Sequence, residues 1–434
     1  MKVNKDLRTI YVIAIVNITL LISFGHIYTH PDTSSYVEAW NTITSGNIDP
    51  LRTPTYPLFL GLMMTVFGEN FMLPAVIGQY FVFLCSIYCF HYISRQTNLK
   101  EQYAFWTTLI YAVCPGICTW CNSILTEGLA MSGCVIFIYS MVKLKEHLSL
   151  YSAFLYCGIL ALLIFLRPAL IYILPITLLT WVGWIYRKEF WKQSLAGIAG
   201  IIVVTAMLLS YMATYKQKYG LFATSNVGVL NGYFIDRWHG LLHPEEIEND
   251  SLRVDIQKSV DKYGLFWTSH IPNRWAEEDQ ILWEETYYIT NKYNHSELSQ
   301  VFRESMLHHP LGHIASVLYR ADWAGKQTLL QCHGGMFWGI LCGWCLGYIT
   351  ISLLYIVLII YLFIMIYRIK HKHVSWITLI TFLMGVANLA VAVAGAQEDW
   401  NRLVAPSLPF YLLIFADLCR YIKIVRPNVT TLKC

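Results

Sequence analysis

Ten long apolar runs constrain the fold of this chain more than any other feature of its sequence. A helix needs about 20 residues to cross the hydrocarbon core of a bilayer, and it satisfies its backbone hydrogen bonds there without outside partners. Charged residues make up only 13% of the 434 residues, about half the share of a soluble domain. We therefore expect an all-α integral membrane protein with about ten transmembrane helices, over residues 8–28, 72–93, 103–121, 126–143, 149–166, 169–186, 194–214, 345–367, 375–395 and 403–421.

Lysine and arginine are unevenly distributed among the connections, and this predicts the orientation. With the N terminus in the cytoplasm, the cytoplasmic segments hold 17 of the 31 basic residues, and the short outer connections hold only Arg52, Arg167 and Arg402. The positive-inside rule favours this arrangement. We expect both termini to be cytoplasmic, in a bacterial cytoplasmic (inner) membrane. This distribution accounts for the net charge of +4, so we expect no nucleic-acid partner.

The basic N terminus and the apolar run behind it also resemble a signal peptide. However, this run is long enough to span a bilayer, and no small-residue cleavage site follows it. We therefore expect it to be the first transmembrane helix.

The spans divide the chain into three parts. Residues 1–214 form an N-terminal transmembrane module whose first outer loop is 29–70, and residues 336–434 form the C-terminal transmembrane helices. Between them, 215–335 is a large outer region, rich in Trp, Tyr and acidic residues and helix-like around 275–293 and 296–309. The apolar segment 54–68 is too short to cross, so we expect interfacial helices after the first span.

Unusual charges lie at the predicted outer ends of the helices. Each short outer connection carries an acid, an arginine or both: Asp32 and Arg52, then Glu127, then Arg167, then Glu398, Asp399 and Arg402. Arginine binds phosphate through a planar fork, and a carboxylate within reach of a hydroxyl can act as its base. Taken one by one, these arginines could instead extend toward lipid headgroups. Taken together, they predict one site assembled at the outer membrane face.

The same residues carry a resemblance to a known family. In order, they are Asp32-x-x-x-Tyr36, the turn at 46–49, Arg52-x-Pro-x-Tyr56-Pro, Phe67-Gly68, Leu125-Thr126-Glu127, Leu166-Arg167-Pro168, and Arg402 with Pro406 and Pro409. This set resembles the polytopic GT-C glycosyltransferases, in particular the protein O-mannosyltransferases and the lipid A aminoarabinose transferases. The resemblance covers about 1–215 and 345–421.

The resemblance implies an activity and a set of roles. It implies transfer of a sugar from a polyprenyl-phosphate donor to a glycan, lipid or protein acceptor at the outer face, with inversion at the anomeric carbon. Asp32 matches the acidic residue of the first outer loop and would be the base, with Glu127 as a supporting acid. Candidate contacts to the donor phosphate and substrate are Arg52, Tyr36, Tyr56, Arg167, Arg402 and Glu398. Protein mannosyltransferases often have an Asp-Glu pair where this chain has Asp32-Thr33, so the sugar and the acceptor stay open.

Two other functions remain alternatives. An oligosaccharide polymerase or ligase would use diphosphate-linked glycans, and arginines of the outer region would then matter more: Arg237, Arg253, Arg274 and Arg303. A lipid-linked glycan transporter or flippase would place its charges midway along the helices. Transporters are often built from paired repeats, and we find no internal repeat here.

Metal and redox motifs are weaker. Glu398 and Asp399 could coordinate a divalent cation, which prefers oxygen ligands, and a divalent cation therefore stays open as a cofactor. His309 and His313 have a spacing that can bind metal on a helix, although it equally suits a helix start at Pro310. We assign no metal ligands. The CxxC sequences at 118–121 and 342–345 lie in apolar runs, where cysteine usually acts as a small apolar residue.

Overall fold

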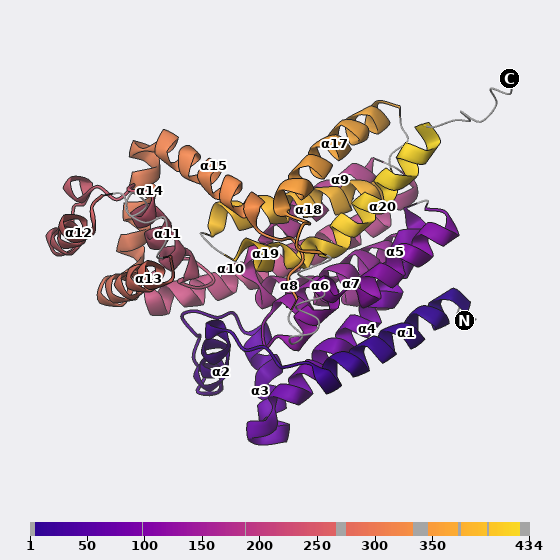
Figure 1. Ribbon diagram of the computed structural model, residues 1–434, viewed down its shortest axis with the longest axis horizontal. Helices are drawn as coiled ribbons and strands as arrows, with labels where there is room; N and C mark the ends of the chain where they lie inside the picture. Colours follow the sequence, from indigo (N-terminus) through magenta and orange to yellow (C-terminus); the bar gives the residue numbers. More distant parts are fainter. Residues whose placement is uncertain are drawn as a thin grey trace.

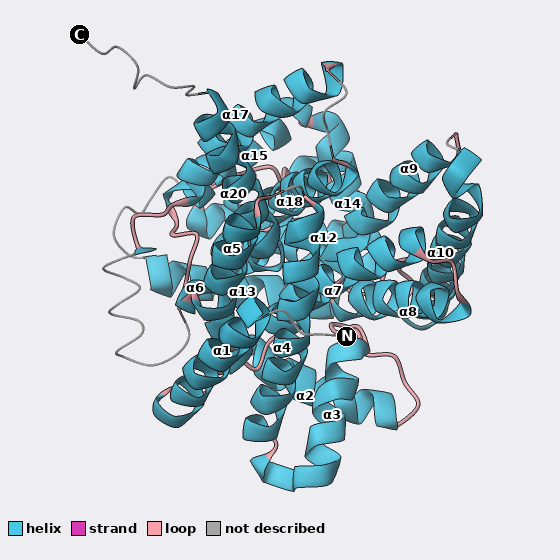
Figure 2. Ribbon diagram, turned by 90° about the vertical axis from the view of Figure 1, so that its right-hand side faces the viewer, coloured by secondary structure: helices cyan, strands magenta, loops and turns pink. Residues whose placement is uncertain are grey.

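Long helices make up most of this protein, and together they form a bundle with a smaller helical region at one end (Figure 1). The computed structural model describes residues 5–97, 99–186, 188–265, 275–332, 346–371, 375–396 and 399–425. Within these ranges there are no strands, only isolated bridges at Tyr28–Ser123 and Thr328–Thr350 (Figure 2). The predicted all-α membrane fold is therefore confirmed.

The described part of the chain contains eight helical segments long and apolar enough to cross a membrane. They are α1 (Lys5–Phe24), α4 (Met72–Gln96), α7 (Glu127–Glu146), η3 with α9 (Pro168–Tyr172 and Ile173–Ile185), α10 (Trp191–Tyr219), α17 (Ile351–Lys370), α18 (Trp376–Gly395), and α19 with η7 and α20 (Trp400–Val404, Ala405–Ser407 and Leu408–Val425).

The two remaining predicted spans are less regular. The run 103–121 is a pair bent by 57° between α5 (Glu101–Val113) and the short helices α6 (Pro115–Cys118) and η2 (Thr119–Asn122). The bend falls at Pro115, which has no backbone N–H to continue the helix. The run 149–166 is α8 (Leu150–Leu166), an apolar helix of 17 residues. A short helix, η4 (Lys188–Phe190), connects α9 to α10.

Helix α7 lies at the centre of the bundle, where it packs against α4 and α8. Gly133 permits a close approach to α8, because a Cβ atom there would lie 2.8 Å from the side chain of Leu163. Helix α1 begins and α20 ends at the same end of the bundle (Figure 1). We call the opposite end the outer end, following the charge prediction.

The first outer connection folds into α2 (Pro31–Thr44), α3 (Thr55–Phe67) and η1 (Gly68–Asn70). The predicted short segment 54–68 is α3. Helix α2 has a capping box in which His30 and Thr33 bond each other's backbone N–H groups, and Pro31 occupies its first turn. Helices α2 and α3 pack closely at Gly61, where a Cβ atom would lie 2.1 Å from the Trp40 ring.

The outer region contains η5 (Pro244–Glu246) and five longer helices: α11 (Val227–Trp238), α12 (Asp250–Tyr263), α13 (Trp275–Lys292), α14 (His295–His308) and α15 (Pro310–Lys326). It has its own apolar core, which includes Tyr233, Ile256 and Leu298. The buried guanidinium of Arg237 donates hydrogen bonds to the carbonyls of Ser259, Gly264 and Leu265. These bonds hold α11 to the C-terminal end of α12.

The outer region is bonded to both transmembrane modules. Tyr219 at the end of α10 donates a hydrogen bond of 2.7 Å to the carbonyl of Ile48. Arg320 on α15 donates one of 2.8 Å to the carbonyl of Ala394, in the last turn of α18. The outer region therefore contacts the first connection that carries the predicted site and the helix that leads into the last one.

We expect Gln79→Leu to lower the free energy of unfolding. The Gln79 side chain is fully buried and donates hydrogen bonds to the carbonyls of Cys121 and Ser123, at 2.9 and 2.8 Å. Losing the partner of a buried polar group costs about 1–3 kcal/mol. Thermal unfolding in detergent would measure this loss, with Gln96→Leu, at an exposed position of the same helix, as the control. Equal losses for the two variants would contradict the role of Gln79.

Candidate functional site

Five charged side chains from four separate outer connections form a continuous row at the outer end. Asp32 accepts a hydrogen bond of 2.7 Å from Arg52 on one oxygen and one of 2.5 Å from Arg402 on the other. Arg402 also donates through Nε to Oε1 of Glu127, at 2.7 Å, and Arg167 donates to the same oxygen at 2.8 Å. Arginines and carboxylates therefore alternate along the row, in the order Arg52, Asp32, Arg402, Glu127, Arg167.

Asp32 lies in the first turn of α2, and the cap of that helix sets its direction. The Asp32 backbone N–H donates to Nδ1 of His30, and the same nitrogen lies 3.3 Å from Arg402. Burial alone would raise the pKa of Asp32. The positive charges of Arg52 and Arg402, with their hydrogen bonds, outweigh burial and hold this pKa well below its ordinary value.

Arg52 is positioned by a turn and an aromatic ring. The carboxylate of Asp49 accepts hydrogen bonds from the backbone N–H groups of Leu51 and Arg52, which fixes the turn. The guanidinium then donates to the hydroxyl of Ser35 at 2.8 Å, and its carbon lies 4.4 Å from the centre of the Tyr36 ring. This combination of hydrogen bonds and cation–π contact presents the guanidinium to Asp32.

Tyr36 in turn rests on Tyr56. The two rings meet edge to face, with their centres 4.8 Å apart. The hydroxyl of the fully buried Tyr56 donates to Gln79, 3.3 Å away. Tyr36 therefore contacts the charged row directly, whereas Tyr56 packs against Tyr36 on the side toward the protein interior.

Glu127 is the first residue of α7, and its side chain is completely buried. A helix N terminus favours negative charge. The preceding segment is held against the first outer connection, because the backbone N–H of Tyr28 donates to the carbonyl of Asn122 and that of Ile124 donates to the carbonyl of Tyr28. The hydroxyl of Thr33 also donates to the carbonyl of Ile124. These bonds fix α2 relative to α7, and so Asp32 relative to Glu127.

The remaining two arginines stand at helix ends. Arg167 caps the C terminus of α8, directly before Pro168. Arg402 lies on α19, which begins after Asp399. Asp399 has a φ of 54°, a left-handed conformation that is uncommon outside glycine. Its carboxylate lies 3.8 Å from Arg402 and 3.6 Å from His30, at the exposed rim of the row.

The row contains three guanidinium groups and two carboxylates, and the carboxylate of Asp399 at the rim lies 3.8 Å from Arg402 as a third acid. Arg52 and Arg402 keep 16% and 13% of their side chains exposed, Asp32 keeps 30%, and Glu127 keeps none. The accessible part of the row therefore holds two arginines beside one acid, and these arginines could bind an anion with several oxygen atoms.

The structure brings most of the predicted site residues together. Arg52, Asp32, Arg402, Glu127 and Arg167 form the row, and Tyr36 packs against Arg52. Tyr56 is close but does not reach the charges, and Glu398 lies outside the described residues. His30 and Ser35 also contact the row and were not predicted. For His30 the signal was available, because a residue directly before Pro31 is a common helix cap position.

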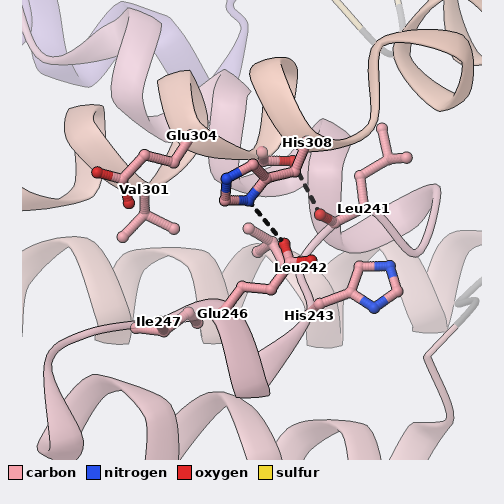
Figure 3. A pocket seen from close by; sticks show the side chains of 9 residues that line it. Leu241, Leu242, His243, Glu246, Ile247, Val301, Glu304 and His308 are labelled. Atoms are coloured by element: carbon pink, nitrogen blue, oxygen red, sulfur yellow. Dashed lines mark hydrogen bonds and ion pairs between the residues drawn. The ribbon is translucent and has the colours of Figure 1, made fainter.

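The described residues contain no candidate metal site. Nowhere among them do three His, Cys, Asp or Glu side chains lie close enough together to hold a metal ion. His309 bonds Glu246 at 2.9 Å, whereas His313 bonds Ser305 at 3.0 Å, so these two histidines have separate partners. Figure 3 shows Glu246 reaching the neighbouring His308. The space beside Glu246 and His308 has a volume of about 10 Å³, room for one water molecule at most.

The first of the two CxxC sequences, at 118–121, lies in the interior of the protein. Cys118 and Cys121 are both buried, and burial in this apolar setting favours a packing role. Residues 342–345 lie outside the described part of the chain.

We expect Glu127→Gln to destabilise the folded protein by about 3–5 kcal/mol, because it leaves the buried Arg167 and Arg402 without their shared counter-charge. Glu101→Gln is a matched control, since Glu101 is also the first residue of a helix but is 62% exposed and lies 3.8 Å from Arg95. An exposed pair of this kind contributes at most about 1 kcal/mol. Thermal unfolding in detergent measures both, and a small effect of Glu127→Gln would show that the row does not hold the modules together.

Comparison with known proteins gives little further information. No protein-family model matches the sequence, and no curated protein matches it. Among solved structures, the fold is similar to the archaeal oligosaccharyltransferase AglB from Archaeoglobus fulgidus, in complex with an inhibitory peptide and a dolichol-phosphate. The TM-score is 0.48 and the sequence identity is 13%, over 98% of this chain. The chain spans about half of that protein, covering 52% of its length.

Proposed function

We propose that this protein is a membrane glycosyltransferase that moves a sugar from a polyprenyl-phosphate carrier to an acceptor at the outer membrane face. The observation that carries the proposal is the row of three arginines and two acids, in which Arg52, Arg402 and Asp32 are partly exposed. A lipid-linked sugar phosphate needs a cationic contact for its phosphate and a base for the incoming hydroxyl. The row offers both within one hydrogen-bonded group.

Arg52 and Arg402 would bind the donor phosphate. Both guanidinium groups now bond Asp32, and a phosphate oxygen is an equivalent acceptor for them. Arg402 would keep its hydrogen bond from Nε to Glu127 and offer its other nitrogen atoms to the phosphate. Arg167, bonded to the opposite side of Glu127, would add positive charge without direct contact.

Asp32 would act as the base once the phosphate has taken its partners. With both arginines bonded to it, the pKa of Asp32 is too low for efficient proton removal. When the phosphate takes over those hydrogen bonds, the pKa of Asp32 rises. The acceptor oxygen then bonds to the anomeric carbon as its proton passes to Asp32, the bond from that carbon to the phosphate oxygen breaks, and polyprenyl phosphate leaves. No step is assigned to a metal ion.

An apolar cleft beside the row would suit the lipid chain of the carrier. It has a volume of about 290 Å³ and lies between α8, η3 and α10. Its lining includes Ile164 and Pro168, which lie on either side of Arg167 in the sequence, together with Ile171, Leu208 and Phe222. An isoprenoid chain bound there would have its phosphate end near the row.

The alternatives have less support from the described residues. A ligase acting on diphosphate-linked glycans would need further arginines in the outer region. Arg237 is buried against backbone carbonyls and Arg253 bonds the carbonyl of Ile247, whereas Arg303 on α14 is exposed. Arg274 lies outside the described residues. A transporter would carry charges midway along its spans, whereas this row lies at one end. The arginines could also simply extend toward lipid headgroups. In that case Arg167 and Arg402 would not both bond the buried carboxylate of Glu127, as they do here.

We expect Asp32→Asn to lower the transfer rate by about 10²–10⁴-fold, the usual contribution of a general base, with little loss of donor binding. The assay supplies the purified protein in vesicles with a short polyprenyl-phosphate sugar, and in parallel with the diphosphate-linked sugar. Glu38→Gln, an exposed acid on the same helix, is the control. Wild-type-like transfer by Asp32→Asn would exclude Asp32 as the base, and consumption of only the diphosphate-linked sugar would favour the ligase alternative.

We expect Arg52→Gln to shift the acid limb of the pH–rate profile to higher pH. Removing a neighbouring positive charge disfavours the carboxylate form, so the pKa of Asp32 rises toward its ordinary value. The dependence of kcat/KM on pH reports groups of the free enzyme, in which both arginines bond Asp32. Arg95→Gln, at an exposed arginine remote from Asp32, should leave the profile unchanged. An unmoved acid limb in Arg52→Gln would contradict the coupling of Asp32 to Arg52.

A further inference from the structure

Helix α15 has the reverse of the polarity expected for a helix packed on a soluble domain. Its buried side carries Ser316 and Arg320, each only 3% exposed. Its exposed side carries Leu311, Ile314 and Leu318, with exposed fractions of 78%, 56% and 65%. These three residues follow the spacing i, i+3 and i+7, so they form one apolar stripe along the helix.

The buried polar side is bonded in place, so the helix cannot rotate to cover its apolar stripe. Arg320 donates to the carbonyl of Ser316 within the helix and to the carbonyl of Ala394 on α18. Rotating α15 about its axis to cover the stripe would break the bond from Arg320 to Ala394. The exposed stripe is therefore a fixed property of the fold.

The end of α15 lies where α17 begins. The backbone N–H of Ile351 donates to the carbonyl of Gln327, Ser352 donates to the carbonyl of Gly325, and Tyr355 donates to the carbonyl of Ala321. Figure 1 shows α15 running from α14 to the start of α17. The C-terminal end of α15 thus stands at the end of a membrane span, and the stripe ends at Leu318, one helical turn before the Ala321 carbonyl that Tyr355 bonds.

Exposed apolar residues also occur on the neighbouring helices α14 and α17. On α17, Leu353 and Ile356 are 46% and 55% exposed, as expected for the lipid-facing side of a span. Before α15, the last turn of α14 exposes Met306 and Leu307. The C-terminal third of α15 is polar instead, because Asp322 and Lys326 form an exposed salt bridge there.

We propose that α15 is an interfacial anchor whose Leu311, Ile314 and Leu318 enter the outer leaflet of the bilayer. The partner is the lipid surface, because α15 is bonded at its C-terminal end to the beginning of the membrane span α17, and an amphipathic helix of this kind lies in the interface with its apolar face toward the acyl chains. The proposal does not depend on glycosyl transfer.

The anchor has a consequence for the charged row. Arg320 holds α15 to the last turn of α18, and Oε1 of Gln327 accepts from the backbone N–H of Asn401, next to Arg402. The depth of α15 in the leaflet therefore helps to set the position of Arg402 relative to the lipid headgroups.

A photo-crosslinking amino acid at single positions tests the anchor in the full-length protein. It would replace Ile314 or Leu318, with Ile356 on α17 as the lipid-facing reference and Val254 on α12 as the matched control, since Val254 is also apolar and 51% exposed. The protein is reconstituted in vesicles of phosphatidylethanolamine and phosphatidylglycerol, irradiated, and analysed by mass spectrometry for lipid adducts.

We expect the yield of lipid adduct at 314 and 318 to be within about twofold of that at 356, and about tenfold above that at 254. Yields at 314 and 318 equal to that at 254 would overturn the proposal. Crosslinks from 314 or 318 to a second copy of the chain, in place of lipid, would also overturn it and would identify the stripe as a protein interface. Gel filtration before irradiation selects folded protein for every variant.

Discussion

The bond that Arg402 makes to two acids at once is the interaction on which the rest of the site depends. One side of its guanidinium meets Asp32, on the first outer connection, and the other meets Glu127, at the start of α7. Arg402 comes from the C-terminal helices, more than 270 residues beyond Glu127 in sequence. One side chain therefore joins the two transmembrane modules and sets the state of the candidate base. An anion that binds Arg402 in place of Asp32 would therefore also weaken the contact between the two transmembrane modules.

The surrounding fold is arranged to hold this side chain between its two acids. The bridge between Tyr28 and Ser123 ties the Asp32 helix to the segment before Glu127. Arg320 and Gln327 fix the end of α18 and the start of α19 from the outer region. Each acid is thus supported from the N-terminal half, and Arg402 is supported from the outer region. A site shared among modules in this way can respond to the lipid environment of any of them.

Much of the architecture could be predicted from the sequence, because apolar run length and the placement of charges are local properties. The spans, the α3 segment and the helices near 275–293 and 296–309 follow from them. The pairing within the charged row could not be predicted, since the sequence places Asp32 and Arg402 in two loops without showing which oxygen faces which nitrogen. The capping role of His30 could be read from its place before Pro31, but its contact with Arg402 could not, because that partner lies 372 residues away in the sequence. Similarly, the stripe on α15 is visible in the sequence, but its exposure follows from the bond between Arg320 and a carbonyl 74 residues away.

The shortness of α8 has a mechanical consequence for the membrane around the row. Its 17 residues extend about 26 Å at 1.5 Å per residue, less than the roughly 30 Å of a typical hydrocarbon core. If α8 crosses the bilayer as predicted, a helix this short would draw the bilayer thinner around it. Arg167 caps its outer end, so the headgroup layer beside the apolar cleft would be pulled inward to the level of this guanidinium. A carrier lipid diffusing in the outer leaflet would then meet a local depression, in which its phosphate descends toward the row without leaving the headgroup layer.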